Sequence, residues 1–561
     1  MNLMPVALRD YDKSWLSGDV IAGVTLAAVA IPEVMGYTSI AQMPIQTGLY
    51  TVIFPTLIFA LLGSSKLLVV GADSATAAVL AAGLAGLGIA GLTPNTPEWV
   101  AWCGLTALVC GGLLFLARLL KLGFIGDFLS TSVLVGFLTG VGIQVLTGQI
   151  PDMLGVAKGT GNWFQQQWST ITSIPDANLA TVGFAVLTVG LIVGFGKFLP
   201  KIPGALVAVV LCIVISTVTD ASANGVAVVG AVPSGPPPVG LPQGVTPSDA
   251  VKVLGVAFAC FVLIIAQSAA TARSFAAKHG ERVDINRDIL GLSGANIAAG
   301  LSGTFVVNGS PTKTQILDQQ HGRTQVANMT MSAVVLLFAL FGTGLLTNMP
   351  QATLAGIVFM IGYSLIDALG LKRIKAERFS EFIVAALTGF VVFAVGVEQG
   401  IVLAIVASII EIVRRAYRPK DFVVVQDVGG TPSYVAAAPG TQSEPGLVVF
   451  RFDAELFYAN ASRFSDDVKA LVDGAPDPVR WVLLDASALA DVDYSAGIQL
   501  KDLAHFLQAR GIKVGLVRAD DDLLATLTTY DVIGDESQAR TYPTISKGIA
   551  AFQADQGASQ Q

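Results

Sequence analysis

One apolar run follows another between residues 18 and 416, with only short polar breaks between them. A helix that crosses a bilayer needs about 20 predominantly apolar residues, so this stretch predicts a polytopic membrane domain. The chain is 13% charged, about half the charge of an average soluble domain. Adding the shorter runs that glycine or proline interrupts gives about fourteen segments. The long runs lie at 98–117, 128–150, 179–196, 203–219, 249–271, 325–346, 379–396 and 398–413.

Lysine and arginine sort to alternate loops of this region. The other loops, near 91–98, 220–248, 346–352 and 396–399, have essentially none, and Lys158 in the loop at 151–178 is the main exception. The positive-inside rule places the basic loops in the cytoplasm. Both termini are then cytoplasmic, which requires an even number of spans. The basic clusters are Arg118/Lys121, Lys197/Lys201, Arg273 to Arg287, Arg323, Lys372 to Arg378 and Arg414 to Lys420.

Two short polar stretches interrupt the apolar sequence at corresponding places in its two halves, which the Gly/Pro-rich loop at 220–248 divides. They are residues 68–76 (LVVGADSAT) and residues 305–314 (FVVNGSPTKT). Each passes from β-branched residues through glycine into small hydroxyl residues that open a short helix. Matched interruptions point to the binding site of a secondary transporter, and backbone amides at two facing helix starts bind anions. Helix packing by small residues is the competing interpretation; we favour it for one such stretch but not for two.

The composition changes to that of a soluble domain after Arg414 and Arg415. Residues 421–445 are predicted to be a polar linker or an extended lead-in. Strands and helices then alternate over about 110 residues, which predicts a small α/β domain. The expected strands are 446–452, 481–484 and 512–517, and the expected helices are 462–472, 495–509 and 521–529.

The sequence offers little for metal, nucleotide or nucleic-acid chemistry. Its four cysteines lie in apolar runs without ligand spacing, and its three histidines are scattered. It has no P-loop, and a net charge of −7 gives no basic surface for nucleic acid. We therefore expect no cofactor, no metal, no nucleic-acid partner and no enzymatic activity. Transport energy is expected to come from ion gradients.

A series of short motifs runs in order along nearly the whole chain. In the apolar region these are residues 18–25 (GDVIAGVT), 31–37 (IPEVMGY), 48–50 (GLY), 62–66 (LGSSK), 70–75 (VGADSA), 296–297 (NI) and 309–314 (GSPTKT). Together they resemble the SulP (sulfate permease) family of anion transporters. The tail, with residues 484–487 (LDAS) and 492–497 (VDYSAG), resembles a STAS domain, the usual C-terminal partner of SulP membrane domains.

The resemblance implies a fold of fourteen transmembrane segments in two inverted seven-segment repeats, with a core domain, a gate domain and a C-terminal α/β STAS domain. It places the substrate between the third and tenth segments, which are half-helices preceded by short strands. We set the domain limits at 1–17 for a cytoplasmic N-terminus, 18–418 for the transporter, 419–445 for the linker, 446–555 for the STAS domain and 556–561 for a tail.

Residues at the two helix starts are the predicted substrate ligands. Their small side chains let an oxyanion approach the backbone amides, and Pro311 suits a first helical turn. Lys313 is expected to neutralise the anion or to pair with Glu33 or Asp73, and Asp73 is also placed to cap its helix. The predicted ligands are Ser74, Ala75, Thr76, Gly309, Ser310, Thr312 and Lys313, with Gln267, Tyr37 and Phe305 as further lining residues.

Glu33 is the predicted proton carrier. It follows Pro32, where we expect a local break in the helix, and low-dielectric surroundings favour a protonated carboxyl. Family members commonly have glutamine here. In the eighth segment, relatives that couple to sodium or protons commonly have a carboxylate where this chain has Gln267, so coupling is expected to shift to Glu33. The alternative is a glutamate buried for structure only.

Ser495 is the predicted regulatory position of the tail. It follows Asp493 where bacterial anti-sigma-factor antagonists have a phosphorylated serine. The simpler interpretation is a helix N-cap.

We expect a secondary active transporter of a small inorganic oxyanion, with sulfate ranked first, that works by proton symport and alternating access. It is expected to be a multi-pass homodimer of the plasma or inner membrane, with the anion, the coupling proton and the lipid bilayer as its partners. The alternatives are a bicarbonate or dicarboxylate carrier of the same family, an anion channel, and a non-transporting anion sensor linked to the STAS domain.

Overall fold

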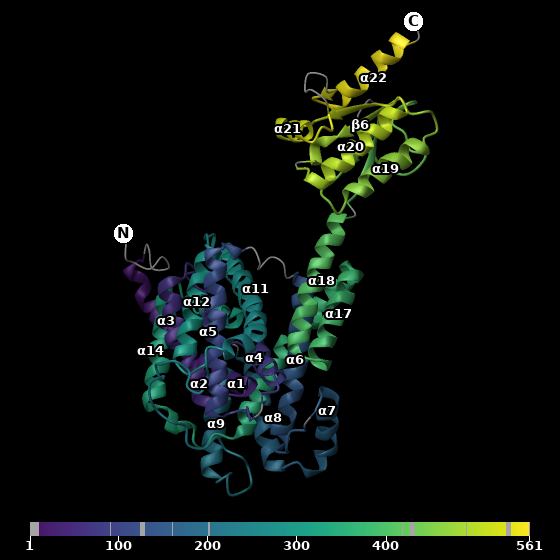
Figure 1. The fold of residues 1–561 in the computed structure, drawn as a ribbon. Helices are drawn as coiled ribbons and strands as arrows, with labels where there is room; N and C mark the ends of the chain where they lie inside the picture. Colours follow the sequence, from purple (N-terminus) through teal and green to yellow (C-terminus); the bar gives the residue numbers. More distant parts are fainter. Residues whose placement is uncertain are drawn as a thin grey trace. The chain divides into compact units, whose positions relative to one another are not determined.

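The structure is a computed structural model, which divides the chain into two compact units, Met1–Ser408 and Ile409–Gln561. Each unit is described by itself below (Figure 1). The structure describes residues 11–89, 91–123, 130–159, 161–199, 202–417, 419–426, 432–489, 491–533 and 540–559.

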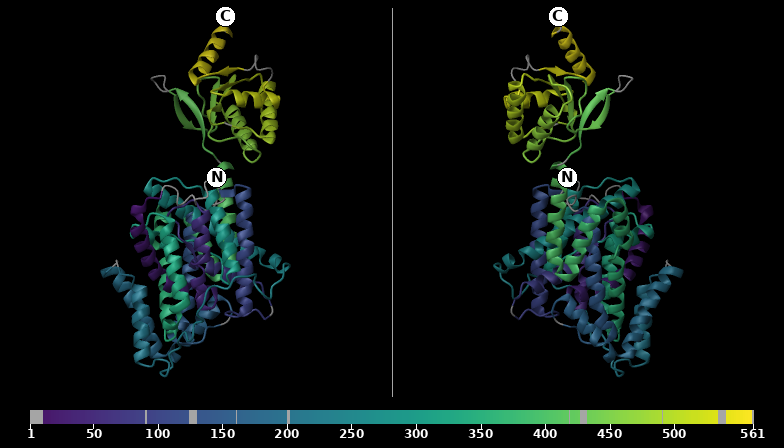
Figure 2. Two further views of the ribbon diagram at one scale, coloured as in Figure 1. Left: turned by 90° about the vertical axis from the view of Figure 1, so that its left-hand side faces the viewer. Right: turned by 90° about the vertical axis from the view of Figure 1, so that its right-hand side faces the viewer.

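The first unit is a bundle of helices that run side by side in all three ribbon views (Figures 1 and 2). Within the described residues, seven candidate spans are long and apolar enough to cross a membrane: Lys13–Ala41 with α1 (Leu16–Ala41), Ile45–Leu62 with α2 (Ile45–Tyr50) and α3 (Phe54–Leu62), α5 (Pro97–Leu119), α6 (Thr131–Leu154), α8 (Leu179–Phe198), α11 (Leu254–His279), and Gln351–Glu377 with α15 (Gln351–Leu365) and α16 (Ala368–Glu377).

Seven further helices complete the set of membrane segments. Four of them are apolar, and three more bring the described segments to the expected fourteen. They are α4 (Ser74–Gly86), α9 (Gly204–Val218), α14 (Gln325–Phe341) and α17 (Phe379–Ala394), then α12 (Ile285–Leu301), α13 (Pro311–Gln319) and α18 (Val397–Tyr417). Two short helices in loops, α7 (Trp163–Thr172) and α10 (Asp249–Lys252), are not counted among them.

The helices pack as two sets, as expected for a core and a gate domain. In the core set, α12 lies against α5 and α3, and α1 lies against α14. In the gate set, α6 lies against α15 and α17, and α8 lies against α9. Glycines let α6 and α17 approach closely: a Cβ added to Gly136 would come within 2.1 Å of the carbonyl oxygen of Ala385. Small residues are the usual means of such close helix contacts in membranes.

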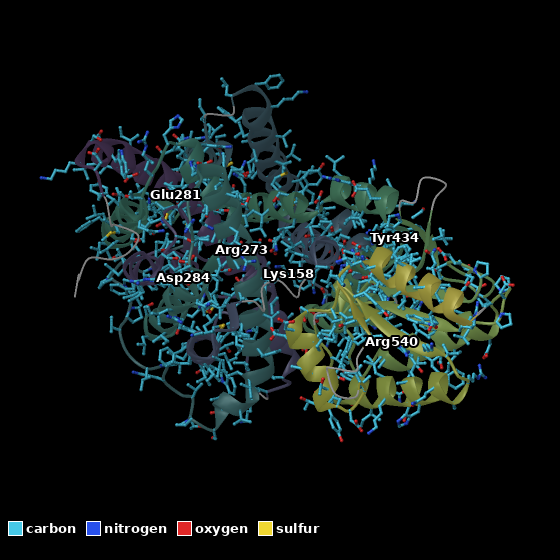
Figure 3. All side chains as sticks on the ribbon, turned by 90° about the horizontal axis from the view of Figure 1, so that it is seen from above. Lys158, Arg273, Glu281, Asp284, Tyr434 and Arg540 are labelled. Carbon is cyan, nitrogen blue, oxygen red and sulfur yellow. The ribbon has the colours of Figure 1, made fainter. Side chains whose placement is uncertain are left out.

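Connections within the core set are tied to each other by polar contacts. Lys66, after α3, pairs with Glu281, after α11, at 2.9 Å, and the Ser64 hydroxyl donates to the Asp284 carbonyl at 2.9 Å. Figure 3 labels Glu281, Asp284 and Arg273 of α11. Asp288 at the start of α12 accepts hydrogen bonds from the amides of Ser64 and Ser65. The two halves of the region are therefore joined at this end of the core.

The two polar stretches predicted from the sequence form a crossing at the middle of the core. Strand β1 (Val70–Gly71) pairs with β2 (Asn308–Gly309) in antiparallel register, and α4 and α13 begin directly beyond them. This confirms the expectation of two half-helices preceded by short strands. The expected break at Pro32 is wrong, because α1 continues through this proline. Proline removes one helical hydrogen bond without ending a helix whose neighbours hold it in place.

The second unit is a six-stranded sheet with the order β4-β3-β5-β6-β7-β8. Strands β5 (Leu447–Phe452), β6 (Trp481–Asp485), β7 (Lys513–Val517) and β8 (Thr541–Tyr542) are parallel. Alternate residues separate the two faces: Val448 and Phe450 pack with the helices α19 (Ala461–Asp473), α20 (Tyr494–Ala509) and α21 (Asp521–Thr529), while Leu447 and Val449 pack with α22 (Ile545–Ser559). The predicted α/β alternation is confirmed.

The segment predicted as a linker belongs to this sheet. Strand β3 (Asp421–Gln426) pairs with β5, and β4 (Pro432–Ala436) pairs with β3, both antiparallel. The expected limits of 419–445 for a linker therefore differ from the structure. The run Phe422-Val-Val-Val425 is rich in β-formers, but no local signal showed that its partner would be a strand more than 20 residues away.

Asp421 at the start of β3 is a buried carboxyl that shares the Arg463 guanidinium with Asp467. Arg463 donates to Asp421 at 2.9 Å and to Asp467 at 3.2 Å. Burial and the neighbouring Asp467 raise the pKa of Asp421 to about 6. Because this folded-state pKa exceeds the ordinary 3.8, the stability due to the protonated carboxyl is complete at acid pH and is lost as the pH rises through about 6.

Asp421→Asn should therefore stabilise the second unit at pH 7.5 and have little effect near pH 4.5. We expect its melting temperature to rise by about 2–5 °C at pH 7.5. Calorimetry of the full chain at both pH values measures this rise. Asp473→Asn, which removes an exposed carboxylate of the same unit paired with Arg510, is the control and should change little. A lower melting temperature for Asp421→Asn at pH 7.5 would contradict the assignment.

Candidate anion site

The crossing of the two half-helices is held by backbone hydrogen bonds. Beyond the β1–β2 pair, the Ser310 amide donates to the Val69 carbonyl at 2.9 Å, and the Val69 amide donates to the Thr314 hydroxyl at 3.1 Å. Both amide side chains of Gln325 and Asn328 on α14 donate to the Leu68 carbonyl. These contacts fix the first turns of α4 and α13 relative to each other.

A chain of side chains from α11 holds β2 in place. The Ser268 hydroxyl donates to Asn308 Oδ1 at 2.7 Å and accepts from the Gly309 amide at 3.0 Å. Asn308 Nδ2 donates to Gln267 Oε1 at 2.7 Å. Gln267 therefore ties α11 to β2, and its carbonyl oxygen is already engaged.

Lys313 places a fully buried ammonium group at the centre of the crossing. Its side chain is 0% exposed, and Nζ donates to the Ala72 carbonyl at 2.9 Å. Nζ lies 3.4 Å from Glu33 Oε2 and 4.6 Å from the centre of the Tyr37 ring. A buried charge is tolerated only when such partners compensate it, and here α1 and the end of β1 supply them.

Glu33 is the counter-ion of Lys313, and its two oxygens differ. Oε1 accepts a hydrogen bond from the Tyr37 hydroxyl, one helical turn away. Oε2 faces the ammonium but has no hydrogen-bond partner within the described residues. The side chain is 13% exposed, so it is the partly accessible member of the pair. This geometry leaves one oxygen available for a proton.

The two helix starts are not equivalent. Asp73 caps α4, since its carboxylate accepts from the Ala75 amide at 3.1 Å. Ser310 caps α13, where its hydroxyl accepts from the Lys313 amide at 3.4 Å. With every group ionised, the carboxylates of Glu33 and Asp73 and the ammonium of Lys313 sum to −1. An oxyanion is disfavoured in that state unless a carboxyl is neutralised.

Two family models match the chain. Residues 16–388 match the sulfate permease family, and residues 438–548 match the STAS domain. A probable sulfate transporter of Mycobacterium tuberculosis is 32% identical over 549 residues, which cover 98% of this chain and 97% of the relative. The chain belongs to the sulfate permease family. This transporter family, which moves anions across membranes, is not a family of enzymes, and its members are multi-pass membrane proteins.

More distant relatives and solved structures agree with this assignment. Low affinity sulfate transporter 3 of Stylosanthes hamata is 27% identical over 588 residues, covering 98% of this permease and 90% of the relative. The structure of the murine solute carrier 26 family member A9 anion transporter, inward-facing, has a TM-score of 0.86 at 21% identity, covering 98% and 94% of the two chains. The transmembrane domain of a cyanobacterium bicarbonate transporter has a TM-score of 0.61 at 23% identity, covering 71% of this chain and 97% of that one. These two likenesses show the fold.

The structure brings together most of the predicted site residues. Glu33, Tyr37, Lys313 and Gln267 meet at the crossing, as described above, and Gly309 lies in β2. At the helix starts Ala75, Thr76 and Ser310 are fully buried and Ser74 is nearly so, whereas Thr312 is exposed in the first turn of α13. The roles of these residues as ligands stay predictions.

Two predicted residues lie elsewhere. The Phe305 ring is fully buried in the core, where it packs ahead of β2. Ser495 is exposed in the first turn of α20, where Asp493 provides the cap by accepting from the Ala496 amide at 2.8 Å. The interpretation of Ser495 as an N-cap is therefore wrong. Its regulatory role stays a prediction.

Three contributors to the crossing were not singled out from the sequence. They are the Ala72 carbonyl, Ser268 and Asn308. Asn308 directly precedes the predicted Gly309, and its amide in an apolar run was a usable signal because buried polar groups need partners. Nothing in the sequence could have identified the Ala72 carbonyl, because every residue has a backbone carbonyl and the sequence does not show which one binds a side chain.

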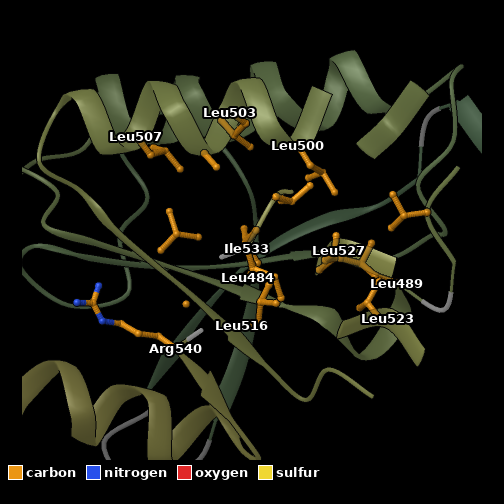
Figure 4. Close-up of a pocket in the computed structure, with 15 residues that line it drawn as sticks. Leu484, Leu489, Leu500, Leu503, Leu507, Leu516, Leu523, Leu527, Ile533 and Arg540 are labelled. Atoms are coloured by element: carbon orange, nitrogen blue, oxygen red, sulfur yellow. The ribbon is translucent and has the colours of Figure 1, made fainter. Parts of the chain in front are cut away.

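The second unit contains a cavity of about 280 Å³ that does not suit an anion. It lies between β6, β7 and the helices α20 and α21, and its lining is mostly leucine (Figure 4). Among the described residues that line it, Arg540 is the one ionisable residue, and its guanidinium lies over the Trp481 ring at 5.3 Å. The lining offers no set of hydrogen-bond donors, so the site at the crossing is the better candidate.

Lys313→Met should destabilise the membrane unit, because it leaves Glu33 buried without a counter-ion. Breaking one side of a buried pair costs about 3–5 kcal/mol, whereas neutral replacement of both sides is often tolerated. We expect a lower melting temperature for Lys313→Met and recovery of most of the loss in the Glu33→Gln/Lys313→Met double variant. Thermal unfolding of the purified protein in nanodiscs measures both.

Lys66→Met is the matched control, since it breaks the more exposed pair with Glu281. Exposed pairs contribute at most about 1 kcal/mol, so this variant should melt close to wild type. A double variant as unstable as Lys313→Met alone would show that the ion pair is not what Lys313 contributes.

Proposed function

We propose that this chain is a proton-coupled symporter of a small inorganic oxyanion, with sulfate as the first substrate to test. The observation that supports it best is the buried Lys313 ammonium, held between two half-helix starts and paired with Glu33 at 3.4 Å. A substrate anion and the Glu33 carboxylate are alternative counter-ions for the same cation. Anion binding and carboxylate protonation are then linked.

The charge balance gives the sign of this linkage. Protonation of Glu33 changes the formal sum at the crossing from −1 to 0 and releases Lys313 from its ion pair. An oxyanion then meets a free ammonium together with the hydroxyl of Thr312. When Glu33 loses its proton, it competes with the bound anion for Lys313. One proton therefore travels with the anion, and an inward proton gradient drives uptake.

The relatives named above favour sulfate as the substrate, since both are designated as sulfate transporters. We further propose alternating access by movement of the core set against the gate set, a plasma or inner membrane location with cytoplasmic termini, and a homodimer. The basic loops support the orientation. Gln267 is committed to Asn308 and cannot titrate, which disfavours sodium-coupled bicarbonate transport through that position. The end of the transporter domain at residue 418 remains part of this proposal.

Glu33→Gln should abolish the dependence of uptake on external acid. Wild-type uptake at low sulfate should rise by up to about tenfold per unit fall in pH for a one-proton step. The variant should give a flat pH profile and keep sulfate–sulfate exchange, because glutamine leaves Lys313 free at every pH. Proteoliposomes loaded at pH 7.5 and diluted into buffers from pH 5.5 to 7.5 provide the measurement.

Asp73→Asn is the matched control, since asparagine caps a helix as well as aspartate does. It should retain acid-stimulated uptake. Loss of that stimulation in Asp73→Asn, with an unchanged profile in Glu33→Gln, would assign the proton to Asp73 instead. Anion binding without flux would identify a sensor, and pH-independent current would identify a channel. Competition by sulfate, bicarbonate, nitrate, chloride and fumarate at two pH values would then identify the substrate.

A further inference from the structure

A cavity of about 590 Å³ lies on the border between the core and gate sets. On the core side it is lined by the last turn of α1, the start of α2 and the loop before α5. On the gate side it is lined by the end of α6, the loop after it and the start of α15. Thr38 lines it five residues after Glu33 on α1, a distance of about 7–8 Å along a helix axis. The cavity therefore lies within about two helical turns of the crossing, toward one end of the bundle.

The loops at this end are those that the charge distribution assigns to the outside. Apart from Lys158, the loops at 91–98, 151–178, 220–248, 346–352 and 396–399 contain no lysine or arginine. Lys158 lines the cavity and pairs with Asp152 of α6, with 2.7 Å between Nζ and Oδ2. Their side chains are 52% and 33% exposed. Within the part of the chain that the structure describes, they are the only ionisable residues that line the cavity.

The rest of the polar lining consists of groups that hydrogen-bond without net charge. Five carboxamide side chains come from both sides of the cavity: Gln42, Gln46, Asn95, Gln149 and Gln351. Gln149 is 5% exposed, and its Oε1 has no hydrogen-bond partner in the part of the chain that the structure describes. Buried amides are normally satisfied within the fold. This oxygen is an acceptor, so its missing partner is a hydrogen-bond donor such as water, which indicates a hydrated cavity wall.

We propose that this cavity is an outer vestibule in which the transported oxyanion docks before it reaches the crossing, and that the Asp152–Lys158 pair controls this docking. The inference rests on the proposed function, which supplies the orientation and the substrate class. Amide N–H groups bind the anion loosely, and the Lys158 ammonium exchanges its partner from Asp152 to the anion. Asp152 keeps the empty vestibule neutral, so anions are not trapped there.

The pair predicts opposite effects from removing its two members. Asp152→Asn leaves Lys158 uncompensated and should lower the KM for external sulfate about threefold, whereas Lys158→Gln leaves Asp152 to repel anions and should raise it about threefold. Vmax should stay within about 1.5-fold, because neither residue contacts the crossing. Both shifts should shrink at 0.3 M salt, where exposed charges are screened. Lys158→Arg should behave as wild type.

The test measures initial sulfate uptake by cells that express the full chain, at 0.02 M and 0.3 M ionic strength. The pair Asp249–Lys252 provides the matched control. It has the same 2.7 Å separation and lies at the same end of the bundle, but neither residue lines the cavity. Asp249→Asn and Lys252→Gln should leave KM unchanged. If Asp152→Asn or Lys158→Gln fails to fold, Gln46→Glu adds a carboxylate to the opposite wall and should raise KM.

The outcomes separate this inference from the proposed function. Opposite KM shifts at Asp152 and Lys158, absent from the control pair, support the vestibule. Shifts of the same sign, equal shifts in the control pair, or no shift in a protein with wild-type acid-stimulated uptake would overturn the vestibule and leave the proton-coupled symport intact. Absence of sulfate uptake by the wild type would overturn both.

Discussion

A buried ammonium at the crossing of two half-helices is the constraint on which the membrane unit depends. Lys313 cannot reach water in this structure, so its charge must be balanced by groups brought to it. Those groups come from α1 and from the backbone just before α4, while Lys313 itself belongs to α13. One side chain therefore ties three elements of the core together. A change in the charge of Glu33 alters the charge balance at all three elements. Protonation of this one carboxyl therefore affects the whole crossing.

The same constraint explains why so much polar structure is buried around the crossing. Short strands at mid-membrane leave backbone groups that lipid cannot satisfy. The pairing of β1 with β2 satisfies some of them, and Ser268, Gln325 and Asn328 satisfy others. Most polar groups of this network have hydrogen-bond partners, which makes it rigid, while Asn328 Oδ1 and Glu33 Oε2 have none among the described residues. Under the proposed function, rigidity at the crossing lets a single ion pair, rather than a loop movement, set the affinity for an anion.

Sequence patterns were enough to predict the two half-helices and strands β5, β6 and β7 of the α/β domain, because glycine, small hydroxyl residues and β-branched runs act locally. The failures share a different origin. The continuity of α1 through Pro32 and the pairing of β3 with β5 depend on neighbours far away in the chain. Likewise, no local sequence pattern predicts the contact that the Ala72 carbonyl makes or the pairing of Asp152 with Lys158. Lys158 was noticed as an exception among the outer loops, but only the fold placed it beside a polar cavity.

The two helix starts also differ in a way that bears on how an anion binds. At α4 the Asp73 carboxylate already occupies the position that favours negative charge at a helix start. An oxyanion placed there would have to displace it or approach a like charge. At α13 the cap is the neutral Ser310 hydroxyl, Thr312 is exposed and Lys313 lies in the same turn. We therefore expect an asymmetric site in which α13 provides most of the ligands, while α4, through Asp73 and the Ala72 carbonyl, keeps Lys313 in place until an anion arrives.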